Sequence, residues 1–376
     1  MSNSNQPDYI SSLTPLRGIA ASFVAIHHFQ HRIPNYNYEM SRHTYFFASG
    51  YLWVDFFFIL SGFILSHVYF TKFIDRVRLT HYKQYLLSRL ARIYPLHLFV
   101  LIVLVVLETS KWWLTFFSDV PVENTAFQGH RSLVSALPTL LLIQTWVPSG
   151  NWNPPSWSIS AEFFVYLIFP FMLPFLCKGT RLNLVLKTLV LLLALYSFKS
   201  ILGLVAHATN LQDLIRCLIE FFLGVLVYRC YRDNLFIRFT NHDWPLFAVI
   251  SIIVWCMHFN SPFNDYHEFV VILCFACFVL FLAQNRNVFK RLFNTKFLTH
   301  LGNISYSIYL IHDPVYEFAE KFCKLIFKTV LGSSLSGNVN LMSLFEHVVY
   351  LAILFGIAHL TYSFVESPLR RKWKVR

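Results

Sequence analysis

Charged residues are scarce in this chain of 376 residues, since Asp, Glu, Lys and Arg together make up 13%. Soluble domains average about 25%. A chain with half that share has too little polar surface to face water on all sides, which excludes an ordinary soluble fold. Hydrophobic residues reach 56%, and 40 phenylalanines supply the aromatic surface typical of packed membrane bundles and interfacial belts. The sequence therefore predicts a protein whose main solvent is lipid.

Cysteine is sparse and shows no pairing pattern. The seven cysteines, an odd number, lie mostly inside apolar segments, which does not indicate a disulfide framework. Cys274 and Cys277 form a CxxC without a second ligand pair, so we predict no metal site. The net charge is +12, but the basic residues cluster between apolar segments. The positive-inside rule explains that pattern, and no nucleic-acid partner is expected.

Ten apolar segments approach the length of about 20 residues that a helix needs to cross a bilayer. They lie at 13–33, 51–71, 93–110, 157–177, 183–205, 211–229, 244–259, 267–284, 301–325 and 341–365. The predicted fold is all-α, a polytopic membrane helix bundle of about ten transmembrane helices. The start lacks the basic region of a signal peptide, so the first helix is expected to stay. The predicted organisation is a cytoplasmic tail (1–12), a transmembrane domain (13–366) and a basic cytoplasmic tail (367–376).

A further apolar piece at 131–147 either spans the membrane or forms a re-entrant segment. If it does not span, the basic loops and the tail RRKWKVR share one side. The opposite loops HATNLQD, NSPFNDYHE and SSLSGNVN then carry no Lys or Arg. Ten crossings with both termini cytoplasmic therefore fit the positive-inside rule better than eleven. Segment 109–156 would lie outside, dipping into the membrane only where it lines a cavity.

Polar residues inside the spans are costly and mark the bundle interior. Arg17 and His28 are eleven residues apart, so they share a helix face about 16 Å apart along the axis. A histidine there can accept and return a proton near neutral pH. An interfacial arginine and a core histidine bonded to a carbonyl explain the spacing equally well. His27 is a rival for the functional role.

Two later spans carry polar pairs at the i, i+4 spacing. Ser158 and Glu162 form either a structural network or a functional site, and the carboxylate needs an Arg or His partner. Arg216 and Glu220 are explained most simply by an ion pair within one helix.

Two further patterns involve a polar stripe and a pair of arginines. Ser305, Tyr309 and His312 form a stripe that should face inward, and Pro314 is expected to disrupt the helix next to His312. Arg89 and Arg92 share a helix face and suit a phosphate-bearing ligand. Topogenic charge or anionic lipid headgroups explain these arginines almost as well.

Seven stretches between residues 13 and 371 together resemble the acyltransferase-3 family of membrane acyltransferases. They are LRGIAASFVAIHHF, DFFFILSGFIL, RLARIYPLHLF, WSISAEFFVYLIFP, EFFLG, LGNISYSIYLIHDPV and VESPLRR. The resemblance implies transfer of an acyl group, most often acetyl, from cytoplasmic acetyl-CoA or another acyl-CoA, without a metal. The acceptor would be a hydroxyl of a surface polysaccharide, lipopolysaccharide or peptidoglycan, or of a lipid-linked glycan. The implied location is a bacterial inner membrane, where membrane lipids are the other partner.

The resemblance also assigns residues, and its Arg–ten–His motif selects His28 over His27. Its other motifs fall on Ser61, Gly62 and Phe63; on Arg89 and Arg92; on Trp157, Ser158 and Glu162; and on Tyr306, Ser307, Tyr309 and His312. The family often has Asp or Asn two residues before the arginine, where this chain has Pro15. Some relatives carry an extracytoplasmic hydrolase-like domain after the last span, which this chain is expected to lack.

The implied mechanism gives each site residue a role. Arg89, Arg92 and Arg17 would bind the CoA phosphates, and His28 would be a general base or a covalent acyl carrier. Glu162 would orient the imidazole, while Ser158 or Tyr309 would donate to the oxyanion. The supporting residues are Ser61, Gly62, Trp157, Arg216, Glu220 and His312. The loops at 34–50 and 109–156 would select the acceptor.

Two other classes of protein remain as alternatives. A multi-pass transporter would use the intramembrane His, Glu and Arg side chains as a proton relay, although no internal repeat is visible. A sensory membrane protein would carry the same segments with a degenerate site. Neither alternative would consume a thioester.

Overall fold

The computed structural model describes residues 10–32, 40–117, 126–147, 150–204, 210–259, 265–326 and 339–373. Within these ranges every regular element is a helix. Most of the predicted 1–12 tail, the last three residues of the C-terminal tail and parts of the loops at 34–50 and 109–156 lie outside the described residues. The chain forms two compact units. The first comprises Met1–Tyr82, Ile168–Ala208 and Ile215–Ser305, and the second comprises Lys83–Leu167, Thr209–Leu214 and Tyr306–Arg376.

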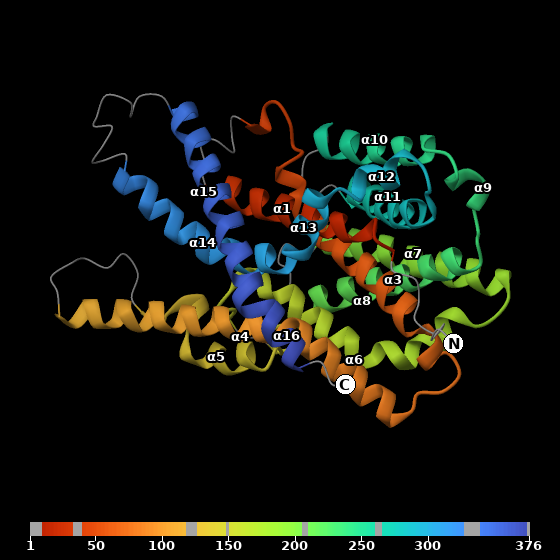
Figure 1. The fold of residues 1–376 in the computed structure, drawn as a ribbon, viewed down its shortest axis with the longest axis horizontal. Helices are drawn as coiled ribbons and strands as arrows, with labels where there is room; N and C mark the ends of the chain where they lie inside the picture. The colour runs from red at the N-terminus through yellow and green to blue at the C-terminus, as the bar shows by residue number, and fades with distance from the viewer. Residues whose placement is uncertain are drawn as a thin grey trace. The chain divides into compact units, whose positions relative to one another are not determined.

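The first unit is built from the N-terminal and central helices (Figure 1). Its elements are α1 (Leu13–His31), η1 (Ala48–Leu52), α3 (Trp53–Phe73), α7 (Arg181–Leu204), most of α8 (Asn210–Arg232), α9 (Ile237–Thr240), α10 (Trp244–Phe259), α11 (Asp265–Gln284), α12 (Val288–Phe293) and α13 (Lys296–Asn303). Helix α1 packs against α13, η1 and α3, while α11 packs against α10, α3 and α7.

The second unit contains the longest helix and the C-terminal helices (Figure 1). Its elements are α4 (Leu79–Phe117), η2 (Gly129–Arg131), α5 (Leu133–Leu140), η3 (Pro154–Ser156), the first half of α6 (Trp157–Cys177), α14 (Ser305–Ile326), α15 (Val339–Thr361), the π-helical turn η6 (Tyr362–Glu366) and α16 (Ser367–Trp373).

Within the described residues, each of the ten predicted spans falls on helical chain. Six helical stretches in the described residues are long and apolar enough to cross a membrane. They are Ala48–Phe73, Leu79–Phe117, Pro154–Cys177, Arg181–Phe198, Tyr266–Gln284 and Glu346–Trp373. Helices α1, α8 and α14 fall outside this set, and α10 is a shorter apolar helix. The count of ten crossings therefore stays a prediction.

Two helix bounds differ from those of the predicted spans. The helix that contains the third predicted span begins at Leu79 rather than near residue 93, because the basic stretch before Arg92 is itself helical. At 39 residues, α4 is about 58 Å long, nearly twice the thickness of the hydrocarbon core. The segment at 301–325 is interrupted at Ile304, where α13 ends and α14 begins.

The apolar piece at 131–147 forms only one short helix. Helix α5 has 8 residues, which is about 12 Å and too short to cross the membrane. The irregular chain after it is held by side chains: the Ser160 hydroxyl donates to Leu142 O at 2.8 Å, and Trp146 Nε1 donates to Ser160 O at 3.0 Å. Such satisfied backbone is what membrane depth permits for non-helical chain.

Helices α3 and α8 cross at two glycines. A Cβ atom on Gly62 would overlap the backbone of Phe221, and one on Gly224 would overlap the carbonyl of Ile59. Each helix therefore places a glycine against the backbone of the other, the usual way in which membrane helices approach closely. Gly62 belongs to the Ser-Gly-Phe motif, so this crossing gives that motif a structural reason.

Candidate active site

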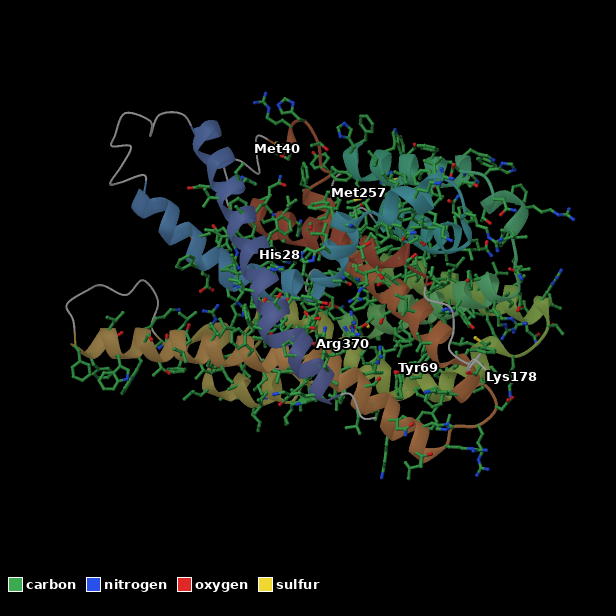
Figure 2. The ribbon with its side chains drawn as sticks, in the orientation of Figure 1. His28, Met40, Tyr69, Lys178, Met257 and Arg370 are labelled. Atoms are coloured by element: carbon green, nitrogen blue, oxygen red, sulfur yellow. The ribbon has the colours of Figure 1, made fainter. Side chains whose placement is uncertain are left out.

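Helix α1 carries the predicted Arg17 and His28 in one uninterrupted stretch. The regular helix keeps them on one face, as their spacing predicts. Both side chains are half-buried, so they are neither locked in the core nor exposed to bulk solvent. Figure 2 shows His28 on this helix.

His27, the rival of His28, is held in place by its neighbours. Its side chain is buried, and its Nδ1 donates to Phe47 O at 3.2 Å. Gly50 lies so close that an added Cβ would be 2.6 Å from the Cβ of His27. The His27 ring also meets His31 edge to face, with centroids 4.4 Å apart, and His28, at 5.2 Å. These contacts fix the ring of His27, whereas the side chain of His28 is less buried.

A buried ionic network lies in the same unit as the histidines. Arg216 Nε donates to Asp55 Oδ1 at 2.5 Å, and the same nitrogen lies 3.7 Å from Glu220 Oε1. The predicted ion pair within α8 is therefore present, but the closer partner is Asp55 on α3. Tyr51 donates to Glu268, whose charge also acts on Arg216.

Sequence reasoning missed Asp55, Tyr51 and Glu268. A buried carboxylate within DFFFILSG signals that a cation must face it, but the spacing along α3 does not show that the cation is on α8. The same applies to Glu268, whose hydroxyl partner is more than 200 residues away in the chain.

Ser158 and Tyr309, the predicted oxyanion donors, hydrogen-bond to each other. Their hydroxyl oxygens are 2.6 Å apart, and both lie near Pro155 O, at 3.1 Å and 3.2 Å. One hydroxyl donates to the other, which leaves the second proton for the carbonyl. Both protons are thus engaged in a structural network, and either residue must break a bond before it can donate to an oxyanion.

The predicted stripe of α14 is buried, as expected: Ser305, Tyr309 and His312 are exposed by 7% or less. His312 Nδ1 donates to Tyr309 O at 2.6 Å within the same helix. The expected disruption at Pro314 is wrong, because α14 continues through it. Proline leaves the carbonyl four residues earlier without its helical donor. Asn153 Nδ2 supplies that donor, reaching Leu310 O at 2.8 Å.

Glu162 and Arg92 lie in the surroundings of Tyr306. The charges of Glu366, Glu162 and Arg92 all act on the Tyr306 hydroxyl, which donates to Ile93 O at 2.6 Å. A carboxylate on α6 and an arginine on α4 are therefore both close enough to Tyr306 to act on it, while the cationic partner expected for Glu162 stays a prediction. Trp157 begins α6, and its carbonyl accepts from Thr145 Oγ1 at 2.8 Å.

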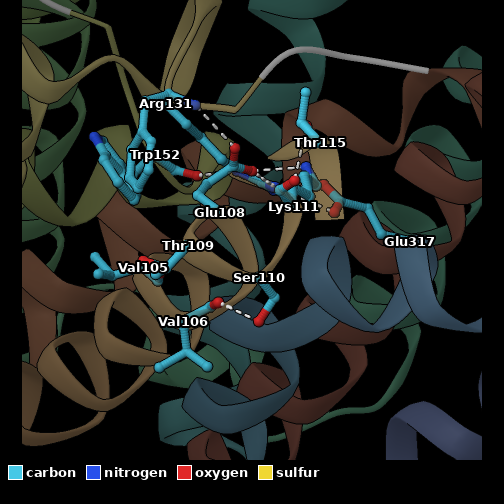
Figure 3. Close-up of polar contacts among 11 residues, drawn as sticks. Val105, Val106, Glu108, Thr109, Ser110, Lys111, Thr115, Arg131, Trp152 and Glu317 are labelled. Atoms are coloured by element: carbon cyan, nitrogen blue, oxygen red, sulfur yellow. Dashed lines mark hydrogen bonds and ion pairs between the residues drawn. The ribbon is translucent and has the colours of Figure 1, made fainter. Parts of the chain in front are cut away.

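Arg131 ties three segments of the second unit together (Figure 3). It donates to Glu108 on α4 at 3.1 Å, to both carboxylate oxygens of Glu317 on α14, and to Trp152 O at 3.2 Å. Burial alone would lower the pKa of Arg131, but the hydrogen bonds and charges of Glu317 and Glu108 raise it above the usual arginine value. Glu108 also accepts from Lys111 at 2.7 Å.

In the described part of the chain, no three His, Cys, Asp or Glu side chains are grouped closely enough to hold a metal ion. The first unit carries a half-buried imidazole on α1 and a buried carboxylate–arginine network. The second unit separately carries the half-buried arginines of α4 and the Ser158–Tyr309 hydroxyl pair.

Long apolar helices with Asp and Glu side chains buried among them indicate an integral membrane protein. The chain belongs to the acyltransferase domain family, acyltransferase-3, whose profile matches residues 10–363. Nearly the whole chain is covered, in agreement with the resemblance carried by its seven motifs.

Curated proteins similar to this chain are acyltransferases of bacteria. O-acetyltransferase OatA of Staphylococcus aureus is 20% identical over 97% of this chain and 58% of its own length. Peptidoglycan O-acetyltransferase OatA of Listeria monocytogenes is 23% identical over 96% of this chain and 56% of its own. Acyltransferase MdmB of Streptomyces mycarofaciens is 34% identical over 32% of this chain and 28% of its own length. The chain thus spans little more than half the length of the OatA proteins. No solved structure is significantly similar to it.

Proposed function

We propose that this protein is an O-acetyltransferase of a bacterial inner membrane, with both termini cytoplasmic. It moves an acetyl group from cytoplasmic acetyl-CoA to a hydroxyl of an extracytoplasmic or lipid-linked glycan. The family match over residues 10–363, together with the half-buried His28 beside the fixed His27, carries the proposal.

His28 performs the proton transfer in this proposal. As a general base it takes the proton of the acceptor hydroxyl while that oxygen attacks the thioester carbonyl. The carbon–sulfur bond then breaks, and the imidazolium returns the proton to the CoA sulfur. In the alternative route, the His28 imidazole attacks the thioester carbonyl, the carbon–sulfur bond breaks, and CoA leaves as the thiol with the imidazole proton. The acceptor oxygen then attacks the acetyl-imidazole, the carbon–nitrogen bond breaks, and the proton of the acceptor hydroxyl passes to His28. Arg17, on the same face of α1, binds a phosphate of CoA or the developing negative charge.

The acceptor is a glycan in this proposal, and the relatives support that choice. The Listeria protein is named a peptidoglycan O-acetyltransferase, and 96% of this chain aligns with 56% of that protein's length. Arg89 and Arg92 on α4 would hold the CoA phosphates, because a guanidinium group forms bidentate hydrogen bonds with phosphate oxygens.

The test is acetyl-CoA turnover by the purified full chain, with a thiol reagent reporting free CoA and a peptidoglycan fragment as acceptor. His28→Ala should lower kcat by about 10²–10⁴-fold, the usual loss on removal of a general base. His300→Ala, an exposed histidine on α13, is the matched control and should turn over like wild type. Equal turnover by His28→Ala and wild type would contradict the proposal at its centre.

The same assay separates the two routes and the transporter alternative. Labelled acetyl bound to the protein in the absence of acceptor, and lost in His28→Ala, supports the acyl-histidine route. Turnover without such labelling supports direct attack. A proton-coupled transporter releases no CoA under any of these conditions.

A further inference from the structure

Three segments of the second unit converge on one turn of α4. Tyr306, at the start of α14, donates to Ile93 O at 2.6 Å. Ser307 beside it donates to Glu366 Oε2 at 2.9 Å, at the end of η6. The Trp373 ring of α16 stacks on Tyr94 of α4, with centroids 6.3 Å apart and planes at 25°. The start of α14, the end of η6 and α16 are therefore all packed near residues 93 and 94.

This convergence brings a third arginine to the pair on α4. Arg370, which Figure 2 labels, lies on α16. It is close enough to Arg92 and Arg89 for their charges to repel one another, and it is attracted by Glu366. All three arginines are half-buried, whereas Arg371 and Lys372, next on α16, are exposed. The exposed pair suits the membrane surface, while the three half-buried arginines point to a more enclosed ligand.

The three guanidinium groups carry like charges, and the Glu366 carboxylate that attracts Arg370 is exposed by only 2%. Repulsion between like charges is unfavourable in a partly buried setting. An anion that accepts from several guanidinium groups relieves that repulsion, and phosphate has the matching geometry.

We propose that Arg370 joins Arg89 and Arg92 in a three-arginine site for a phosphate-bearing ligand, the 3′-phosphorylated adenosine diphosphate portion of acyl-CoA. Buried Glu366, fixed by Ser307, positions the Arg370 side chain. This inference rests on the proposed function, since it names where the proposed acyl donor binds. Anionic lipid headgroups carry the same phosphate chemistry and are the other source to be distinguished.

The experiment compares thioesters with and without the nucleotide, using the full chain in nanodiscs of neutral lipid. Arg370→Ala should raise KM for acetyl-CoA about 10- to 100-fold, the range expected on losing charge-assisted hydrogen bonds. Its kcat should stay within about twofold, and its turnover of acetyl-pantetheine, which lacks the phosphates, should not change. Arg370→Lys should recover part of the affinity. Arg371→Ala, the exposed neighbour, is the matched control.

Binding of adenosine 3′,5′-bisphosphate, measured directly by calorimetry, separates failure of this inference from failure of the proposed function. If wild type binds neither this probe nor acetyl-CoA, the proposed donor itself is wrong. If wild type binds and Arg370→Ala binds equally well, only the three-arginine site is overturned. If Arg370→Ala lost turnover of acetyl-CoA and of acetyl-pantetheine equally, Arg370 would have a structural role, and the three-arginine site would also be overturned. A defect seen only in anionic nanodiscs would assign the arginine to lipid. Should Arg370→Ala not fold, Arg370→Gln enters the same comparison.

Discussion

Two hydroxyls of the second unit have both a predicted catalytic role and an observed structural one. Ser158 and Tyr309 come from helices about 150 residues apart and share the carbonyl of Pro155. Each was a candidate to stabilise an oxyanion, yet their protons are already engaged. Their geometry favours the role of fastening the start of α6 to α14.

Tyr309→Phe tests that role. Removing one hydroxyl should cost about 1 kcal/mol of stability, the net worth of a typical hydrogen bond, and leave kcat within about threefold. Ser158→Ala should behave alike, and the double variant should cost less than the sum, because the two groups share one network. Thermal unfolding and acetyl-CoA turnover are the measurements. A loss of about 100-fold or more in kcat with unchanged stability would instead make the hydroxyl an oxyanion donor.

Spacing along one helix predicted contacts within that helix and failed across helices. The Arg216–Glu220 pair was predictable because i, i+4 neighbours must meet. Asp55 was not, although it is the closer partner of Arg216. A sequence pattern identifies a buried side chain that needs a partner, but it does not show which other helix carries that partner. Ion pairs between helices therefore could not be predicted from the sequence.

At the scale of helices, two glycines determine how closely α3 and α8 can approach each other where they cross. Gly62 and Gly224 each meet the backbone of the opposite helix, which has no rotamer with which to yield. Gly62→Ala should therefore force the helices apart and cost about 1–3 kcal/mol, the usual range for overpacking. The melting temperature of the purified protein is the measurement.

A matched control exists for that substitution. Gly356 in α15 has no atom within 4 Å of an added Cβ, so alanine there meets open space. Because alanine is the better helix former, Gly356→Ala should be neutral or stabilising by about 0.5–1 kcal/mol. If Gly62→Ala melted at the same temperature as Gly356→Ala, the close crossing would not limit the packing.

Arg131 holds the segment between α4 and α6 in place through its ion pairs with Glu108 and Glu317 (Figure 3). Its side chain is 12% exposed and that of Glu108 is 4% exposed. Arg131→Ala should cost about 3–5 kcal/mol, because it leaves Glu108 buried with less of its compensating charge. Hydrogen exchange of residues 126–147 should rise, while the matched control Lys111→Ala, at a more exposed partner of Glu108, should change it little. Unchanged exchange in Arg131→Ala would show that the segment is held by other contacts.

The helices themselves were largely predictable, because apolar runs of about 20 residues leave few alternatives. What could not be predicted were the places where polar chain continues a helix or proline fails to end one. Helix α4 extends through its basic stretch from Leu79, and α14 passes Pro314 because Asn153 satisfies the freed carbonyl. Both outcomes depend on neighbours that are distant in sequence.

At the scale of the whole molecule, the number of membrane crossings decides on which side of the membrane each terminus lies. Helix α5 is too short to span, which removes the eleventh crossing that the apolar composition of 131–147 allowed. Lys111 and Arg131 are the two basic residues described in segment 109–156, which is predicted to lie outside, and they are paired with Glu108 and Glu317. Their charges are therefore offset locally, and the positive-inside bias rests on the other side of the bundle.

Reporter fusions test this topology directly, since alkaline phosphatase is active only outside the cytoplasm and green fluorescent protein folds best within it. Ten crossings predict a fluorescent fusion at the C-terminus, where RRKWKVR supplies the retained positive charge. They also predict an active phosphatase fused after Phe117, at the end of α4, and an inactive one fused after Lys178, which follows α6. An active phosphatase at the C-terminus would contradict the even number of crossings. It would also move Arg370, Arg371 and Lys372 away from cytoplasmic acyl-CoA, so the same fusion that tests the topology constrains the binding site proposed for the donor.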